Sequence, residues 1–281
     1  MSDLEIVRSI SELRAAITGW RRDGQTVALV PTMGALHDAH MALMHEARSR
    51  ADRVVATIFV NPTQFAADED LDSYPRHEAA DIEKLQTDGV DLLFAPEASE
   101  VYPDGFATTI TVTGVSEGLC GDHRPGHFAG VATVVTKLLL QALPDIALFG
   151  EKDYQQLQVI HRLSRDLNIP VEILGVPTVR EPDGLAMSSR NLHLSKAERD
   201  VAPQMYRTLM DVAARLRNGI GSEAACAAGR VQLAENGFSP VEYLEVRDAE
   251  TLAQPLSGHS RRVLSAAWLG ETRLIDSIPL P

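Results

Sequence analysis

Two histidines stand three residues apart in the string PTMGALHDAH, which spans Pro31–His40. At this spacing His37 and His40 share one face of a helical turn, so both imidazoles can donate hydrogen bonds to the same phosphate. Gly34 allows a tight turn before them, and a helix that begins here offers N–H groups and a positive dipole to an anion. The same pattern also fits two solvated histidines, or a pair of zinc ligands.

A second group of polar residues occurs in LFGEKDYQQLQ (148–158). Lys152 can neutralise a phosphate, and Gln156 follows about one helical turn later. Asp153 can accept a hydrogen bond from a ribose hydroxyl or cap the helix that follows. By itself, such a string more commonly means a helix capped by Asp153 with a solvated Lys152.

A third group occurs in LAMSSRN (185–191), where Ser188 and Ser189 precede Arg190. Two hydroxyls and a guanidinium can converge on phosphate oxygens, so the loop could close over a nucleotide. Taken alone, it also fits a linker.

The evidence for other ligand sites is weaker. DHRPGH (122–127) could supply Asp122, His123 and His127 to a metal, but no HExxH string is present and the nearest match is HEAAD at 77–81. Neither a GxGxxG nor a G-K-[ST] string occurs, so the familiar dinucleotide and P-loop signatures are absent.

The bulk composition limits the function classes. The chain has 281 residues, 44% hydrophobic and 23% charged, with a net charge of −13. This charge disfavours nucleic acid or an anionic membrane as a partner. The two cysteines, Cys120 and Cys226, suggest no disulfide framework. No apolar run is long enough to span a bilayer, and residues 1–20 do not resemble a signal peptide. We therefore expect a soluble cytoplasmic protein.

Apolar strands and helices alternate along the first part of the chain. This order predicts a doubly wound α/β domain with a parallel sheet. The predicted strands are 26–32, 53–62, 90–96, 145–150 and 171–176, and the predicted helices are 1–20, 35–50, 77–88, 126–143 and 153–167. Residues 107–114 alternate like a half-exposed strand outside that sheet.

The pattern changes near residue 180. Helical stretches at 195–236 precede three strands at 241–248, 261–270 and 272–280, which predict a small antiparallel sheet. We place the boundary in the loop 176–191, which is rich in Pro, Gly and Ser. The predicted domains are therefore an α/β domain at 1–180 and a smaller α+β domain at 181–281 that includes the lid loop.

As an ordered set, these strings resemble the pantoate–β-alanine ligase (pantothenate synthetase) family. The matching strings are PTMGALHDAH, IFVNPTQF, YPR, RPGHFAGVATVVTKL, FGEKDYQQL, DGLAMSSRN and the C-terminal AAWLGETRLID. The resemblance implies a Rossmann-like nucleotidyltransferase fold of the HIGH-motif superfamily and a homodimer. It implies a ligase that converts pantoate and MgATP to pantoyl adenylate and pyrophosphate, and then joins the pantoyl group to β-alanine with release of AMP.

The resemblance also implies residue roles. His37 would be the catalytic donor and His40 a second phosphate contact, and the other catalytic donors would be Lys152, Ser188, Ser189 and Arg190. The implied ATP site comprises Pro31, Thr32, Met33, Gly34, Ala35, Leu36, His37, Asp38, Ala39, His40, Gly150, Glu151, Lys152, Asp153, Val179, Met187, Ser188, Ser189 and Arg190. Gln64 would bind pantoate and β-alanine and Gln156 would bind pantoate, with Asn61, Tyr74, Arg124 and His127 around the pantoate pocket.

One position departs from the family pattern. The usual string H-x-G-H reads His37-Asp38-Ala39-His40 here, and the extra methyl of Ala39 is expected to weaken ATP binding. ATP would enter with Mg²⁺ as the substrate nucleotide, with no tightly bound cofactor and no resident metal; Asp81 is a candidate contact for the ion.

Three other functions are compatible with the same residues. The fold could transfer AMP to another acceptor, as related nucleotidyltransferases and aminoacyl-tRNA synthetases do, although the acidic charge balance disfavours tRNA. It could bind nucleotide without turnover, or it could be a metal-dependent hydrolase.

Overall fold

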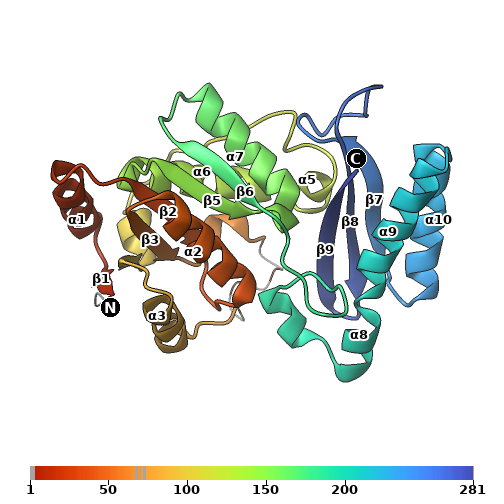
Figure 1. Ribbon diagram of the computed structural model, residues 1–281, viewed down its shortest axis with the longest axis horizontal. Helices are drawn as coiled ribbons and strands as arrows, with labels where there is room; N and C mark the ends of the chain where they lie inside the picture. The colour runs from red at the N-terminus through yellow and green to blue at the C-terminus, as the bar shows by residue number, and fades with distance from the viewer. Residues whose placement is uncertain (1–3, 67–68, 70, 72–73, 281) are drawn as a thin grey trace. The chain divides into compact units, whose positions relative to one another are not determined.

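The computed structural model describes residues 4–66, 69, 71 and 74–280. The chain forms two compact units, called unit 1 and unit 2 here (Figure 1). Unit 1 consists of Met1–Val112, Arg124–Gly150 and Val159–Val176, and unit 2 consists of Thr113–His123, Glu151–Gln158 and Pro177–Pro281. The predicted division into domains at 1–180 and 181–281 stays a prediction.

Unit 1 is built on a six-stranded parallel sheet. Its strands are β1 (Glu5–Val7), β2 (Val27–Thr32), β3 (Arg53–Ile58), β4 (Leu92–Phe94), β5 (Ile146–Gly150) and β6 (Glu172–Val176). The helical elements between these strands are α1 (Ile10–Arg22), α2 (Asp38–Arg50), η1 (Pro62–Gln64), α3 (Glu78–Thr87), α4 (Ala98–Val101), α6 (His127–Ala142) and α7 (Tyr154–Asp166), the last of which begins with residues of unit 2.

The strand order is β1-β4-β3-β2-β5-β6, and every neighbouring pair is parallel. The order runs outward from β2 in both directions, so the sheet reverses between β2 and β5. In sheets of this kind, ligands bind beyond the carboxyl ends of the strands at this switch point. The carboxyl ends in question are Thr32 of β2 and Gly150 of β5.

Both faces of the sheet are covered, which is why its strands are continuously apolar. Ala28 and Val30 of β2 pack in one core cluster with Met44 and Ala47 of α2. Figure 1 shows α2 in front of this sheet and α6 behind it. The predicted doubly wound α/β fold is confirmed.

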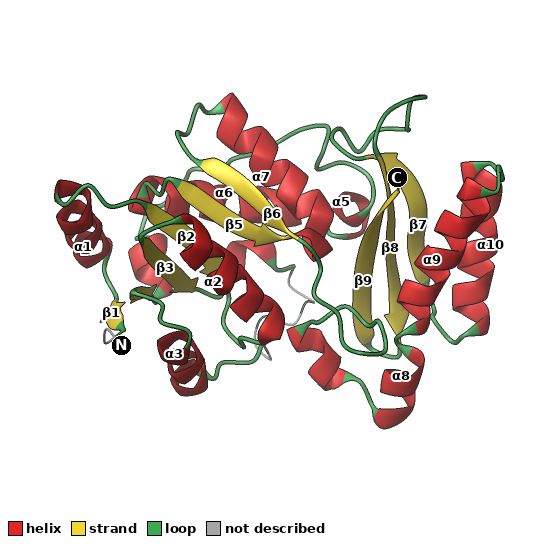
Figure 2. Cartoon of the chain, in the orientation of Figure 1, coloured by secondary structure: helices red, strands yellow, loops and turns green. Residues whose placement is uncertain are grey.

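Unit 2 contains an antiparallel sheet in the order β7-β8-β9. Its elements are α5 (Cys120–His123), η2 (Glu151–Asp153), η3 (Ser189–His193), α8 (Lys196–Val201), α9 (Gln204–Arg217), α10 (Ser222–Glu235), β7 (Val241–Asp248), β8 (Arg261–Leu269) and β9 (Thr272–Leu280). In Figure 2, α9 and α10 lie together beside this sheet. Leu209 of α9, Leu233 of α10 and Leu244 of β7 are fully buried in the shared core.

Two expected elements differ from the structure. Residues 107–114 form no strand, because Ile110 donates its N–H to the Thr133 hydroxyl (2.9 Å) and not to a neighbouring strand. The expected helix at 1–20 begins only at Ile10, and Glu5–Val7 instead pair with β4. The Ser9 side chain caps α1 in a capping box with Glu12, which marks the start of the helix.

Candidate active site

The loop between β2 and α2 has a defined backbone geometry. Gly34 and Ala35 both have positive φ angles, 85° and 50°. The N–H groups of Ala35 and Leu36 each donate to the Asp81 carboxylate at 2.8 Å, and the Gly34 N–H donates to the Thr32 hydroxyl at 3.1 Å. These loop N–H groups are therefore engaged within unit 1. The N–H groups expected to face an anion are those of the first turn of α2, which starts at Asp38.

The two histidines lie together at the N-terminus of α2. His37 is the N-cap residue, and its N–H donates to His40 Nδ1 at 3.3 Å. The imidazole centroids are 4.1 Å apart. Because Nδ1 of His40 accepts this hydrogen bond, the proton of a neutral ring lies on Nε2. Asp38 and Ala39, at the first two helical positions, carry N–H groups with no acceptor inside the helix.

Asn61 organises the residues that follow β3. It is 1% exposed, and its Nδ2 donates to Gln64 Oε1 at 3.0 Å. Tyr102 donates its phenolic proton to Asn61 Oδ1 at 2.8 Å. Gln64 Nε2 in turn lies 3.3 Å from Met33 Sδ. The predicted substrate residues Asn61 and Gln64 thus contact each other and reach Met33 of the β2–α2 loop.

Gly130 of α6 lets this helix approach η1 closely. A Cβ at Gly130 would lie 2.2 Å from the Thr63 carbonyl oxygen, so only glycine lets α6 pack against η1.

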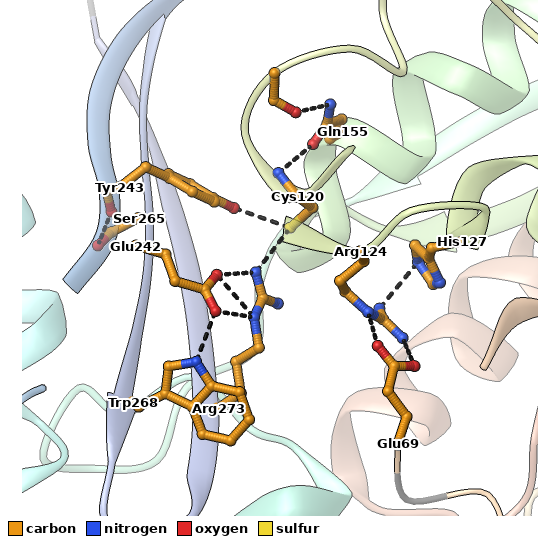
Figure 3. Close-up of polar contacts among 11 residues, drawn as sticks. Glu69, Cys120, Arg124, His127, Gln155, Glu242, Tyr243, Ser265, Trp268 and Arg273 are labelled. Carbon is orange, nitrogen blue, oxygen red and sulfur yellow. Dashed lines mark hydrogen bonds and ion pairs between the residues drawn. The ribbon is translucent and has the colours of Figure 1, made fainter. Parts of the chain in front are cut away.

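Arg124 and His127 form a second polar group in unit 1, drawn in Figure 3. Arg124 makes two hydrogen bonds of 2.7 Å to Glu69 and lies 3.0 Å from His127 Nε2. His127 Nδ1 lies 2.9 Å from the Gln64 carbonyl oxygen. Burial opposes ionisation of Glu69, but the hydrogen bonds and charge of Arg124 dominate and lower its pKa. Tyr74, 7% exposed, packs edge-on against Phe65.

In unit 2, Lys152 lies in η2 directly after β5. Burial lowers the pKa of its ammonium group, Arg190 and Arg273 add to this effect, and Asp153 and Asp276 oppose it. These surroundings therefore disfavour the positive charge of Lys152, and a bound anion would relieve that cost.

The loop 179–191 is closed by backbone hydrogen bonds. The Met187 N–H donates to the Val179 carbonyl at 3.0 Å. Ser188 caps η3, and its hydroxyl oxygen accepts the Arg190 N–H at 3.3 Å. Since that oxygen accepts, the Ser188 proton can point to a ligand. Ser188, Ser189 and Arg190 thus sit on consecutive positions of a turn with defined geometry.

Sequence reasoning missed the residues that support these loops. Arg180 binds Asp276 through two hydrogen bonds of 2.6 and 2.8 Å and stacks on Tyr206 at 3.9 Å. Arg262 stacks on Tyr154 at 3.8 Å and binds Glu151 at 2.9 Å. Their partners are distant in sequence, so no local pattern signals them.

Gln155, beside the predicted contact Gln156, is another residue that sequence reasoning missed. It is buried, and its Nε2 donates to the carbonyls of Val115, Glu117 and Gly118 at 3.1, 3.3 and 3.1 Å. Its Oε1 accepts the Cys120 N–H at 3.0 Å (Figure 3).

The neighbouring part of Figure 3 shows a network on β7, β8 and β9. The Cys120 thiol lies 3.0 Å from the Tyr243 hydroxyl. Arg273 lies 3.5 Å from that thiol and is paired with Glu242 at 2.6 Å, and Trp268 donates its indole N–H to Glu242, also at 2.6 Å. Both cysteines are buried and free.

The predicted site residues therefore fall into two sets, each within one unit. Unit 1 holds residues 31–40, Asn61, Gln64, Tyr74, Arg124, His127 and Gly150, and unit 2 holds Glu151, Lys152, Asp153, Gln156, Val179, Met187, Ser188, Ser189 and Arg190. Gly150 ends β5. Gln156 is half-buried on α7.

Comparison with known proteins identifies the family. A family model described as Pantoate-beta-alanine ligase matches residues 5–279. The chain belongs to the pantoate–β-alanine ligase family. The family resemblance noted in the sequence is thereby confirmed.

Individual family members match over almost their full length. The chain is 56% identical to the pantothenate synthetase of Paramagnetospirillum magneticum, covering 98% of this chain and 97% of that protein. It is 57% identical to the pantothenate synthetase of Azotobacter vinelandii, covering 97% of each.

Solved structures of family members share the fold. A pantothenate synthetase from Thermus thermophilus superposes with a TM-score of 0.93 at 45% identity, covering 99% of both chains. The Francisella tularensis pantoate–β-alanine ligase, solved with β-γ ATP and β-alanine, gives a TM-score of 0.83 at 34% identity, covering 98% of this chain and 97% of that one.

The part of the chain that the structure describes contains neither a group of metal-ligating side chains nor a membrane-spanning helix. No grouping of three or more His, Cys, Asp or Glu side chains suited to a metal ion occurs among these residues. Within the same ranges, none of the helices has the length and apolar character that a bilayer crossing requires.

Proposed function

We propose that this chain condenses pantoate with β-alanine in an ATP-dependent reaction, through pantoyl adenylate. The observation that carries the proposal is the family match over residues 5–279. The AMP-forming ligase activity expected from the sequence is confirmed by that match and by relatives named pantothenate synthetase.

The reaction has two balanced steps. A carboxylate oxygen of pantoate attacks the α-phosphorus of ATP, and the bond to pyrophosphate breaks. The amine of β-alanine then attacks the acyl carbon, AMP leaves, and the amine loses a proton as the amide forms. Neither step needs a covalent enzyme intermediate, so positioning and charge stabilisation are the main tasks of the protein.

We assign the ATP contacts to the residues implied by the family resemblance. His37 and the Nε2–H of His40 would donate to phosphate oxygens at the start of α2, supported by the ring geometry above. Lys152 would neutralise phosphate charge, which is consistent with the burial that lowers its pKa. Ser188, Ser189 and Arg190 would supply further donors as the triphosphate forms pyrophosphate.

The substrate contacts follow the same reasoning. Gln64 would bind pantoate and β-alanine, and its contact with Asn61 supports a fixed orientation for its amide. Gln156, Tyr74, Arg124 and His127 would complete the pantoate pocket.

Mg²⁺ is proposed to enter with ATP as part of the substrate. The earlier candidate Asp81 is buried, and both of its carboxylate oxygens already accept backbone N–H groups. The ion would be held mainly by the phosphates.

We also propose that the active protein is a cytoplasmic homodimer. Light scattering after gel filtration tests the dimer, since a monomer mass at assay concentration would contradict it.

A pyrophosphate-release assay tests the function. Release that requires pantoate, with AMP formed and pantothenate produced only when β-alanine is added, is the expected result. Release without pantoate, or ATP binding with no release, would contradict it and would favour transfer to another acceptor or a non-catalytic nucleotide-binding protein. His37→Ala is expected to lower adenylate formation at least about 100-fold while the circular dichroism spectrum stays unchanged.

A further inference from the structure

We propose that Asp81 is a positioning residue for nucleotide binding, which holds the β2–α2 loop in the conformation that presents His37 and the N-terminus of α2. This inference rests on the proposed function of that loop. Asp81 lies on α3, outside the segments to which we assign ATP contacts.

Both oxygens of the Asp81 carboxylate accept hydrogen bonds from the loop. The residue is 2% exposed. Its Oδ2 accepts the Ala35 N–H and its Oδ1 accepts the Leu36 N–H, both at 2.8 Å. Hydrogen bonds from an N–H to an ionised carboxylate are stronger than those between neutral groups. One side chain thus binds two consecutive N–H groups of a segment that lies 45 and 46 residues earlier in the chain.

The loop backbone needs such a partner. Ala35 has φ of 50°, in the left-handed region that an alanine rarely adopts. Gly34 has φ of 85°, a conformation that favours glycine, and a Cβ there would also be tight, at 3.1 Å from Asp81 Oδ2 and 3.2 Å from Ile58 Cγ2. The carboxylate therefore compensates a conformation that the Ala35 side chain opposes.

Two further contacts fix Leu36. Its side chain is 2% exposed in the core cluster of unit 1. Its carbonyl accepts a hydrogen bond from the Lys84 ammonium, which lies one turn after Asp81 on α3. Helix α3 thus contacts the peptide groups of Leu36 through two side chains. The Asp81 carboxylate accepts from its N–H, and the Lys84 ammonium donates to its carbonyl.

The result is a division of roles within the loop. The N–H groups of Ala35 and Leu36 are occupied by Asp81, whereas Asp38 and Ala39 stand at the first two positions of α2, where N–H groups lack helical acceptors. His37 follows Leu36 directly, so a change in the backbone conformation at Leu36 would displace both the His37 imidazole and the start of α2. Asp81 therefore acts through the loop and not through contact with the nucleotide.

Asp81→Asn is the direct test. It keeps the size of the side chain but points an amide N–H₂ at a backbone N–H. In pantoate-dependent ATP–pyrophosphate exchange, kcat/KM for ATP is expected to fall about 100-fold, mostly through KM. The rate of amide formation from supplied pantoyl adenylate and β-alanine should change much less.

Asp91→Asn is the matched control. Asp91 also accepts a backbone N–H, from Val54 at 2.8 Å, and an arginine hydrogen bond, from Arg53 at 2.7 Å. It lies immediately before β4, at the amino end of the sheet. This variant should lose thermal stability and keep its KM for ATP. An unchanged KM in Asp81→Asn, or an equal rise in Asp91→Asn, would overturn the proposal.

A rescue variant separates positioning from simple destabilisation. Adding Ala35→Gly to Asp81→Asn removes the Cβ that opposes a positive φ, so part of the lost ATP affinity should return. No recovery in the double variant at an unchanged melting temperature would count against the proposal.

Amide hydrogen exchange of the unmodified protein tests the role of Asp81 independently. It requires neither a variant that folds nor a measurement of turnover. The Ala35 and Leu36 amides should exchange slowly without nucleotide, because the carboxylate protects them. Fast exchange at both would overturn the role of Asp81. An unmodified protein that releases no pyrophosphate would instead overturn the proposed function, and the exchange result would still decide about Asp81.

Discussion

At the residue scale, Ala39 is the position where this chain departs from the H-x-G-H pattern. It occupies the second position of α2, between the two histidines, and is half-buried. A glycine there would leave more room for a phosphate near the N–H groups of the first turn.

Ala39→Gly is expected to lower KM for ATP more than it raises kcat, and to cost up to ~1 kcal/mol of helix stability. Ala42→Gly, one turn further along α2, is the control: it should cost similar stability without changing KM. Steady-state kinetics and urea unfolding measure both effects. Equal kinetics for Ala39→Gly and the unmodified protein would show that the methyl is harmless.

Also at the residue scale, the buried position of Lys152 is expected to reduce the stability of the fold. Because its folded-state pKa is lowered, the protonated lysine is less favourable in the folded than in the unfolded protein. This penalty is present at neutral pH, where the unfolded lysine is charged, and disappears only as pH rises above the unfolded pKa of 10.5.

Lys152→Met should therefore raise the free energy of unfolding by about 1 kcal/mol at pH 7 and reduce adenylate formation at least about 100-fold. The stability gain should shrink toward pH 10. Lys196→Met, on α8 and outside the proposed site, should not change the kinetics. A less stable Lys152→Met variant would show that the charge is well compensated without a ligand.

At the element scale, Gln155 and Gln156 are neighbours on α7 with different predicted roles. Gln155 holds three carbonyls and one N–H of residues 115–120. Removing it leaves buried backbone groups without partners, each costing roughly 1–3 kcal/mol.

Gln155→Ala is therefore expected to lower the free energy of unfolding by at least about 2 kcal/mol. Gln156→Ala should change it little and instead raise KM for pantoate. Urea unfolding and pantoate titrations distinguish the two. The reverse pattern would mean that the substrate contact is Gln155.

The turn after β7 gives a pH-dependent prediction at the same scale. Burial opposes ionisation of Asp248, but hydrogen bonds from Thr251, His259 and Glu250 outweigh it and lower its pKa from 3.8 to about 2. The side chain is 6% exposed, so the contribution to stability is about 2 kcal/mol. It is fully present above pH 3.8 and is lost as pH falls toward 2.

Asp248→Asn should therefore be less stable than the unmodified protein by up to about 2 kcal/mol at neutral pH, and the difference should narrow below pH 4. Chemical unfolding between pH 3 and 7 measures it. Asp104→Asn, at an exposed position, is the control. A constant difference down to pH 3 would mean that the stabilisation of Asp248 does not depend on its charge.

At the scale of the whole molecule, the net charge of −13 disfavours tRNA as a partner. Binding to a polyanion releases counterions only where many cationic side chains meet phosphates. We expect no binding of labelled tRNA in fluorescence anisotropy at ~0.15 M salt, and saturable binding would favour the alternative of AMP transfer to an RNA-linked acceptor.

Much of the architecture could be predicted because it depends on local patterns. Buried parallel strands such as Val27–Thr32 are short apolar runs, and helices such as Tyr154–Asp166 and Gln204–Arg217 differ from them in periodicity. The predicted strand at 107–114 was wrong because alternating residues form a strand only where a partner strand is available. Ile110 instead donates its N–H to the side chain of Thr133 on α6.

The sequence by itself determined the family, the two-step ligase chemistry and the candidate donors, because those depend on residue types in a fixed order. Only the tertiary structure shows which polar side chains already have hydrogen-bond partners within the protein. Asp81 changed from a possible Mg²⁺ contact to the partner of Ala35 and Leu36, and Gln155 became the support of residues 115–120. The physical reason is that a buried polar group must find its partners in space, and those partners lie more than 30 residues away along the chain.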